Sequence, residues 1–162
     1  MNQQTFDLMI GKLTFEIASA TENDSEVIVK LLSELYLELG EEKESIAFLS
    51  GEFIRFIINT EVTKIYLVRE EHQYIGIFTL TESQAIYAGG KYGIIDEMYI
   101  SPDFRQKKIG EDILKYIFQI ALKNNWKRVD VTAPTDEKWI RTRKFYEKNG
   151  FVFTGPKYKF KL

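Results

Sequence analysis

The spacing of the hydrophobic positions changes several times along the chain between the period of a strand and that of a helix. Residues 13–19 alternate with a period of two, which predicts a strand. Thr21 and Asp24 resemble a capping box, because a hydroxyl is followed three residues later by an acid. The leucines that come next recur at helical spacing and predict a helix that ends near Gly40.

The middle of the chain predicts one more helix and three strands. Residues 46–59 have a helical period, after which the period becomes two. Residues 65–68 and 74–80 predict a hairpin around a polar turn, and residues 92–100 predict a further strand that ends before Pro102.

The last third alternates helices and strands. Apolar residues at every third or fourth position predict a long amphipathic helix over 109–124, and a second helix is expected over 137–149. Residues 129–133 predict a strand between these helices, and residues 151–153 and 158–160 predict two closing strands. Helices and strands in this mixed order indicate an α+β fold, neither doubly wound nor a barrel.

Composition indicates one globular domain over residues 1–162. Apolar residues make up 44% of the 162 positions and charged residues 28%, which suffices for a core. Residues 1–12 are weakly patterned and could form an arm or an extra strand. The apolar runs are too short to cross a bilayer, and the first residues show no secretory signal, so we expect a cytoplasmic protein with no membrane partner.

Cysteine is absent and His72 is the single histidine. Disulfides, thiolate nucleophiles and Cys/His zinc sites are therefore excluded, and no metal is expected. A serine–histidine–aspartate triad would need His72, which stands in a polar stretch that reads as an exposed turn. Chemistry must then depend on carboxylates, tyrosines, backbone donors or a bound co-substrate.

Charge differs between the two halves of the chain. Residues 1–81 carry 6 basic and 14 acidic side chains, and residues 82–162 carry 16 basic and 10 acidic ones, so the halves have charges of −8 and +6. This asymmetry suggests different partners for the two halves. The net charge of −2 disfavours nucleic acid, whereas a phosphorylated small molecule suits the basic half.

A basic cluster stands at the start of the helix predicted from residue 109. Arg105, Lys107 and Lys108 precede Gly110, which has no Cβ and lets an anion approach the main chain. A helix start with cationic side chains is suited to a pyrophosphate. The spacing matches neither a P-loop nor the glycine fingerprint of dinucleotide folds.

Residues 95–110 and 144–151 resemble two motifs of the GNAT superfamily of N-acetyltransferases. The order of elements over residues 13–161 is also similar, so the resemblance covers nearly the whole chain. It implies a mostly antiparallel, V-shaped sheet of seven strands with about four helices. It also implies an acyltransferase that uses acetyl-CoA as co-substrate.

The resemblance implies which residues bind acetyl-CoA. Arg105 opens the pyrophosphate loop and Gly110 is its last glycine. Lys108 departs from the pattern, which usually has glycine there; a lysine adds charge for phosphate but prefers negative φ. Trp139 replaces an asparagine that the family often has. The implied acetyl-CoA residues are Met98, Tyr99, Ile100, Arg105, Gln106, Lys107, Lys108, Ile109 and Gly110.

The resemblance also implies catalytic residues. Tyr146 matches the tyrosine that family members use as general acid toward the leaving thiolate, and Asp96 and Glu97 are the candidates for the base, although some members use water instead. Adjacent strand residues point to opposite faces unless a bulge intervenes, so only one acid is expected to face the acceptor. Asp96 and Met98 are two positions apart, so they are expected on the same side of the strand. The resemblance implies that related enzymes present a carboxylate from this side.

The acceptor is expected to be a primary amine of a small molecule, and the acidic first half favours a cationic one, polyamine- or aminoglycoside-like. Tyr36 and Tyr87 stand in the segments that normally shape the acceptor site. Two alternatives remain: a protein or peptide N-acetyltransferase, and a CoA-binding regulatory module without transfer activity. Exposed apolar residues in 1–12 or in the terminal strands could also pair two copies in a homodimer.

Overall fold

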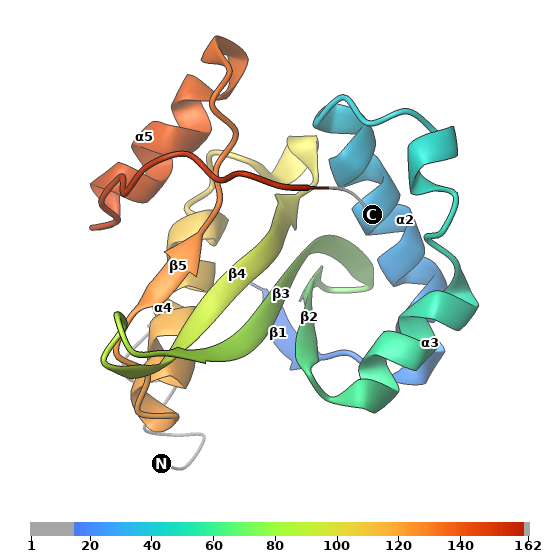
Figure 1. Cartoon of the computed structure of the whole chain (residues 1–162). Coiled ribbons are helices and arrows are strands. Elements are labelled where there is room, and N and C mark those ends of the chain that lie inside the picture. The colour runs from blue at the N-terminus through green and yellow to red at the C-terminus, as the bar shows by residue number, and fades with distance from the viewer. Residues whose placement is uncertain (1–14, 161–162) are drawn as a thin grey trace.

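The computed structural model describes residues 15–160, which form one mixed sheet with helices on both faces (Figure 1). Within this range the sheet has five strands in the order β1-β2-β3-β4-β5. Neighbours are antiparallel from β1 to β4, and β5 is parallel to β4. The strands are β1 (Glu16–Ser19), β2 (Thr63–Glu70), β3 (Gln73–Ala85), β4 (Gly90–Ile100) and β5 (Val129–Val131).

Four α-helices of the described range divide between the two faces of the sheet. Helices α2 (Ser25–Glu38) and α3 (Gly51–Thr60) pack on one face, around the buried Ile28, Leu32 and Ile77. Helix α4 (Ile109–Lys123) covers the other face, and α5 (Ile140–Lys148) packs beside it. Figure 1 shows α2 and α3 on the opposite side of the sheet from α4. The expected α+β class is confirmed.

Most of the predicted elements are present, with shifted ends. The capping box of Thr21 and Asp24 is confirmed and begins a 3-10 turn that leads into α2. The helix predicted from residue 46 begins only at Gly51, because the side chain of Ser50 accepts a hydrogen bond from the Phe53 N–H and caps it there. None of the helices within residues 15–160 is both long and apolar enough to cross a membrane.

The expectation of seven strands is wrong. Neither 151–153 nor 158–160 forms a strand, and in the stretch 151–160 all side chains except Phe151 are exposed. An alternating pattern needs a neighbouring strand to supply hydrogen bonds, and β5 offers only three residues, which pair with β4. Gly155 and Pro156 also interrupt the segment. The extra strand considered for 1–12 lies outside the described residues.

Strand β4 separates from β5 halfway along its length. The parallel pairing joins Gly93, Ile94 and Ile95 to Val129–Val131. From Asp96 onward, β4 keeps only its antiparallel partner β3, so its other edge is free within the described range. This free stretch leads directly to the loop before α4.

Candidate active site

A β-bulge in β4 carries the two candidate acids. Phe78 pairs with Met98 and Leu80 with Ile95, so Asp96 and Glu97 together oppose the single residue Thr79. The bulge is held by Thr79, whose hydroxyl accepts from the Glu97 N–H at 3.0 Å and donates to the Glu97 carboxylate.

Both acids lie on the α2 face of the sheet, contrary to the expectation that only one would. Thr79 bonds Glu97, and the Thr81 hydroxyl donates to Asp96 Oδ2 at 2.6 Å. Thr79 and Thr81 are alternate residues of β3 and therefore point to one face. The extra residue of the bulge cancels the alternation between the two acids.

The bulge also separates Asp96 from Met98. These residues were expected on one side of the strand because their positions differ by two. Met98 instead packs into the cluster under α4, on the opposite face, where it lies 3.8 Å from the Tyr146 hydroxyl. The prediction that Asp96 and Met98 share a face is wrong, because the extra residue of the bulge moves the side chains that follow it to the other face of the strand.

Tyr36 of α2 contacts the acid pair. Its hydroxyl donates to Glu97 Oε1 at 2.7 Å. Burial, followed by the charges of Glu97 and Asp96, raises the Tyr36 pKa well above its usual range, so the phenol keeps its proton. Of the two tyrosines predicted for the acceptor side, the structure brings this one to the carboxylates.

Tyr87 lies at the other end of β4. It stands in the turn between β3 and β4, its side chain is 71% exposed, and its hydroxyl is 3.1 Å from that of Tyr92. Six residues separate the start of β4 at Gly90 from Asp96, which corresponds to roughly 20 Å. The structure does not bring Tyr87 to the acid pair.

Two further glutamates of α2 face the end of β4. The Tyr99 hydroxyl donates to Glu34 Oε2 at 3.1 Å, and burial together with Glu34 raises the Tyr99 pKa to about 12. Glu38 pairs with Arg105. The Tyr99 side chain therefore points to the α2 face, so only its main chain lies along the free edge of β4.

The loop before α4 has a backbone conformation that would suit an anion. Gln106 and Lys108 have φ angles of 63° and 64°, in the left-handed region. Lysine at 108 thus adopts the backbone that a glycine would take. The N–H groups of residues 106–108 donate no hydrogen bond within the described part of the chain. Free main-chain donors at the start of a helix form a concave site for phosphate, which fits the pyrophosphate of CoA.

Arg105 and Gly110, at the two ends of this loop, have structural contacts. The Arg105 guanidinium donates two hydrogen bonds to Glu38 and one to the Ile100 carbonyl oxygen. A Cβ on Gly110 would lie 3.1 Å from the Phe145 ring, so this glycine also allows α4 and α5 to pack closely. The side chains of Lys107 and Lys108 are exposed, and Lys107 Nζ lies over the Phe104 ring.

Tyr146 lies where β4 leaves β5. It is buried, with Phe145 and Phe151 at 5.2 and 5.3 Å between ring centroids, and its hydroxyl points to the Met98 sulfur. Burial raises the Tyr146 pKa to about 12, so the hydroxyl carries its proton at neutral pH.

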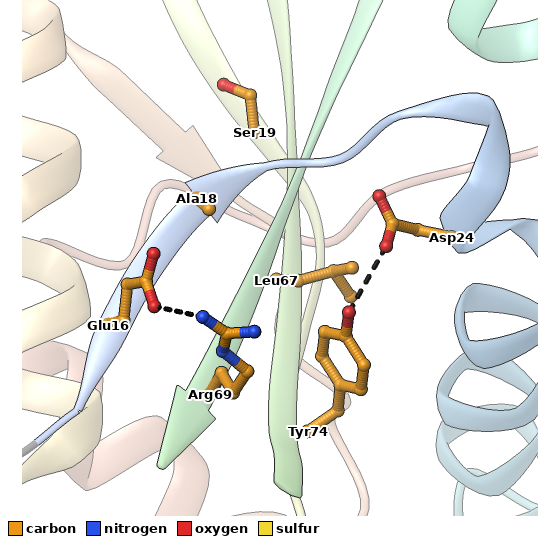
Figure 2. A pocket seen from close by; sticks show the side chains of 7 residues that line it. All are labelled: Glu16, Ala18, Ser19, Asp24, Leu67, Arg69 and Tyr74. Carbon is orange, nitrogen blue, oxygen red and sulfur yellow. Dashed lines mark hydrogen bonds and ion pairs between the residues drawn. The ribbon is translucent and has the colours of Figure 1, made fainter. Parts of the chain in front are cut away.

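Two cavities lie away from these groups, and no predicted site residue lines either one. One, of about 110 Å³, lies at the β1 edge, where Arg69 pairs with Glu16 and Tyr74 donates to Asp24 (Figure 2). The other, of about 570 Å³, lies between the start of β2 and the ends of α3 and α4.

Sequence reasoning missed Thr79, Thr81 and Glu38. Thr79 is a hydroxyl within the apolar run 74–80, and a polar side chain at such a position signals a specific partner. Nothing local distinguishes Glu38 from the other acids of its helix.

The candidate site thus combines a bulged strand that separates from its parallel neighbour, N–H groups before α4 that have no hydrogen-bond partner within residues 15–160, and a buried tyrosine. The acetyltransferase (GNAT) domain family matches residues 61–153, more than half of the chain. The chain belongs to this family and is an acyltransferase, and the family uses acetyl-CoA. No curated protein matches the sequence.

Solved structures share the fold at low identity. A ribosomal-protein-alanine N-acetyltransferase from Brucella melitensis biovar Abortus 2308 is 17% identical, with a TM-score of 0.74 over 91% of this chain and 99% of that one. An aminoglycoside acetyltransferase from an uncultured soil metagenomic sample, in complex with sisomicin, is 15% identical, with a TM-score of 0.77 over 92% and 97%. A predicted acetyltransferase with acetyl-CoA from Clostridium acetobutylicum is 18% identical, with a TM-score of 0.75 over 91% and 96%.

Proposed function

We propose that this protein transfers the acetyl group of acetyl-CoA to a primary amine of a small cationic molecule. The observation that carries the proposal is the bulge in β4. It directs Asp96 and Glu97 to the α2 face, while Met98 and the Tyr146 hydroxyl lie on the α4 face of the same strand. Groups suited to an ammonium and groups suited to a thioester therefore lie on opposite faces of one strand.

Acetyl-CoA would be held by the loop and by the free edge of β4. The N–H groups of residues 106–108 would donate to the pyrophosphate, with the Lys107 and Lys108 ammonium groups nearby. The main chain of Met98–Ile100 would bind the pantetheine arm along its free edge. When bound, acetyl-CoA supplies an acetyl group activated as a thioester.

Proton transfers are assigned to three side chains. The amine must lose a proton before it attacks, and Asp96 or Glu97 accepts it, directly or through water. Tyr36 orients the Glu97 carboxylate through its 2.7 Å hydrogen bond. Tyr146 donates its phenolic proton to the leaving sulfur, and its raised pKa ensures that the proton is present at neutral pH.

The cationic acceptor is supported by the charges on the α2 face. Glu34 lies near the end of β4, on the same face as Asp96 and Glu97, whereas the charge of Glu38 there is balanced by Arg105. Carboxylates around a cleft raise the local concentration of a cation and speed its association. The structurally similar aminoglycoside acetyltransferase was solved in complex with sisomicin, whose amines make it a cationic molecule.

The test is a thiol-release assay across polyamines, aminoglycosides, amino acids and peptides, with acetyl-CoA binding followed by thermal unfolding. We expect acetyl-CoA at ~100 times its Kd to raise stability by about 2.7 kcal/mol. Cationic small amines should be the best acceptors, with a KM that rises with salt. Acetylation of peptides alone would show a protein-directed enzyme. Binding without transfer to any amine would show a CoA-binding module.

Tyr146→Phe isolates the proposed general acid. We expect kcat to fall about 100-fold or more, because the sulfur then leaves without a proton donor. The KM for acetyl-CoA should stay within about twofold, since the ring packing is retained. Tyr158→Phe is the control, as that side chain is 90% exposed. Equal turnover in Tyr146→Phe and the parent would remove Tyr146 from the mechanism.

A further inference from the structure

We propose that Glu38 of α2 is a positioning residue for acetyl-CoA: through Arg105 it holds the loop 106–108 in the conformation that binds the pyrophosphate. The proposal depends on the function proposed above, because it assumes that this loop binds acetyl-CoA. Glu38 itself would not touch the ligand.

Arg105 is fixed by three partners on two elements. Its Nη1 and Nη2 donate to Glu38 Oε1 and Oε2 at 2.9 and 2.6 Å, and its Nε donates to the Ile100 carbonyl oxygen at 2.8 Å. The guanidinium carbon lies 5.5 Å from the centre of the Tyr99 ring. Paired charge-assisted hydrogen bonds of this kind fix direction as well as distance. The side chain therefore joins the end of α2 to the end of β4.

The loop needs such an anchor. Gln106 and Lys108 both have left-handed backbone angles. Residues other than glycine rarely adopt these angles and keep them only where the surrounding structure imposes them. The N–H groups of residues 106–108 donate no hydrogen bond in the described part of the chain, so these donors do not hold the loop in place. At its far end, the buried Ile109 and the bond from Asp112 N–H to the Lys108 carbonyl hold it to α4.

At its near end, the loop is held by Arg105, whose own backbone is extended, and by the partners of its side chain. Removing the Glu38 charge would end the paired hydrogen bonds of the Arg105 guanidinium to residue 38, and would leave its bond to the Ile100 carbonyl, its contact with the Tyr99 ring and the Arg105 N–H bond to the Pro102 carbonyl oxygen. Gln106 and Lys108 could then relax to ordinary angles, and the N–H groups would no longer converge on one anion.

The experiment compares the parent with Glu38→Gln by calorimetric titration of CoA and by kinetics with two acetyl donors. Acetyl-CoA contains the pyrophosphate, whereas S-acetylpantetheine does not. We expect the Kd of CoA and the KM of acetyl-CoA to rise about tenfold, which corresponds to about 1.4 kcal/mol. The KM of S-acetylpantetheine and the kcat at saturation should not change, an outcome that general loosening of the fold would not produce.

Glu16→Gln is the matched control. It removes the same charge from another exposed Arg–Glu pair, in which Arg69 Nη2 lies 2.6 Å from Glu16 Oε2, on the edge strand β1 (Figure 2). That pair lies outside the loop, so the control should bind CoA as the parent does. Should Glu38→Gln fail to fold, Arg105→Lys tests the same point, because it keeps the charge and loses the paired geometry.

Three results would overturn the proposal. An unchanged Kd would show that Glu38 does not position the loop. Equal losses for both acetyl donors would show a general structural defect. Tighter CoA binding by Glu38→Gln would show that Glu38 draws Arg105 away from the phosphates. Absence of CoA binding by the parent itself would instead contradict the proposed function.

Discussion

At the scale of single residues, Lys108 combines two properties that oppose each other in the loop. Its ammonium suits a phosphate, yet its φ of 64° lies in the region that favours glycine. The loop keeps its conformation despite the lysine. The residue therefore adds charge to the proposed acetyl-CoA site at a cost in backbone energy of about 1–2 kcal/mol.

Lys108→Gly should consequently stabilise the protein. We expect a gain of about 1 kcal/mol and a Tm higher by roughly 2–4 °C, because glycine adopts this conformation without strain. Lys108→Ala is the control, since it removes the same charge but keeps a Cβ. The measurement is thermal unfolding of the three proteins without ligand. Equal stabilisation by both substitutions would mean that charge, and not backbone strain, is responsible.

At the scale of elements, the bulge in β4 determines which groups face which side. Thr79 is 2% exposed and bonds both the N–H and the carboxylate of Glu97. Without it, a buried polar contact is lost, and across the two strands the bulge keeps the hydrogen bond from Thr81 to Asp96. The position of Glu97 thus depends on a hydroxyl from the neighbouring strand, together with the Tyr36 hydroxyl.

Thr79→Val removes that hydroxyl and keeps the shape of the side chain. We expect a loss of about 1–3 kcal/mol in the free energy of unfolding, the usual cost of leaving a buried polar group unpaired. Thr81→Val is the matched variant, because it removes the more exposed hydroxyl that bonds Asp96, and it should cost less. Urea denaturation measures both. Losses of the same size would contradict a special role for the bulge.

At the scale of the whole molecule, tyrosines in the core give stability a dependence on alkaline pH. Burial is the first cause of a raised pKa at six of them, with values of about 12 at Tyr99 and Tyr146. The six are Tyr36, Tyr66, Tyr74, Tyr99, Tyr116 and Tyr146. These phenols lose their protons more readily in the unfolded chain, where the pKa is about 10.

The sign of the effect follows from that difference. Below pH 10 the phenols are protonated in both the folded and the unfolded chain, so their contribution to the free energy of unfolding is fully present. This contribution is lost as the pH rises from 10 through about 12. We expect the unfolding free energy to fall over this window, and to fall less steeply in Tyr146→Phe. Tyr158→Phe, at an exposed position, should follow the parent. Identical slopes in all three proteins would contradict the expectation.

The sequence by itself determined the α+β class, the order of the helices and central strands, and the motif residues from Asp96 to Gly110 and around Tyr146. The class and the order of the elements follow from periodicity and capping, which depend on neighbours in the chain. The motif residues follow from the resemblance to the GNAT superfamily. The left-handed angle at Lys108 was not predicted, because the sequence indicated only that lysine departs from the usual glycine and prefers a negative φ.

The tertiary structure alone decided where the side chains of the site point. Asp96 and Glu97 share a face because of a bulge that is hydrogen-bonded to Thr79, eighteen residues away from Glu97. Arg105 faces Glu38, sixty-seven residues distant, and the segment 151–160 remains without a strand because β5 is short. Each outcome depends on which distant segment supplies a partner, and a local pattern holds no information about that choice.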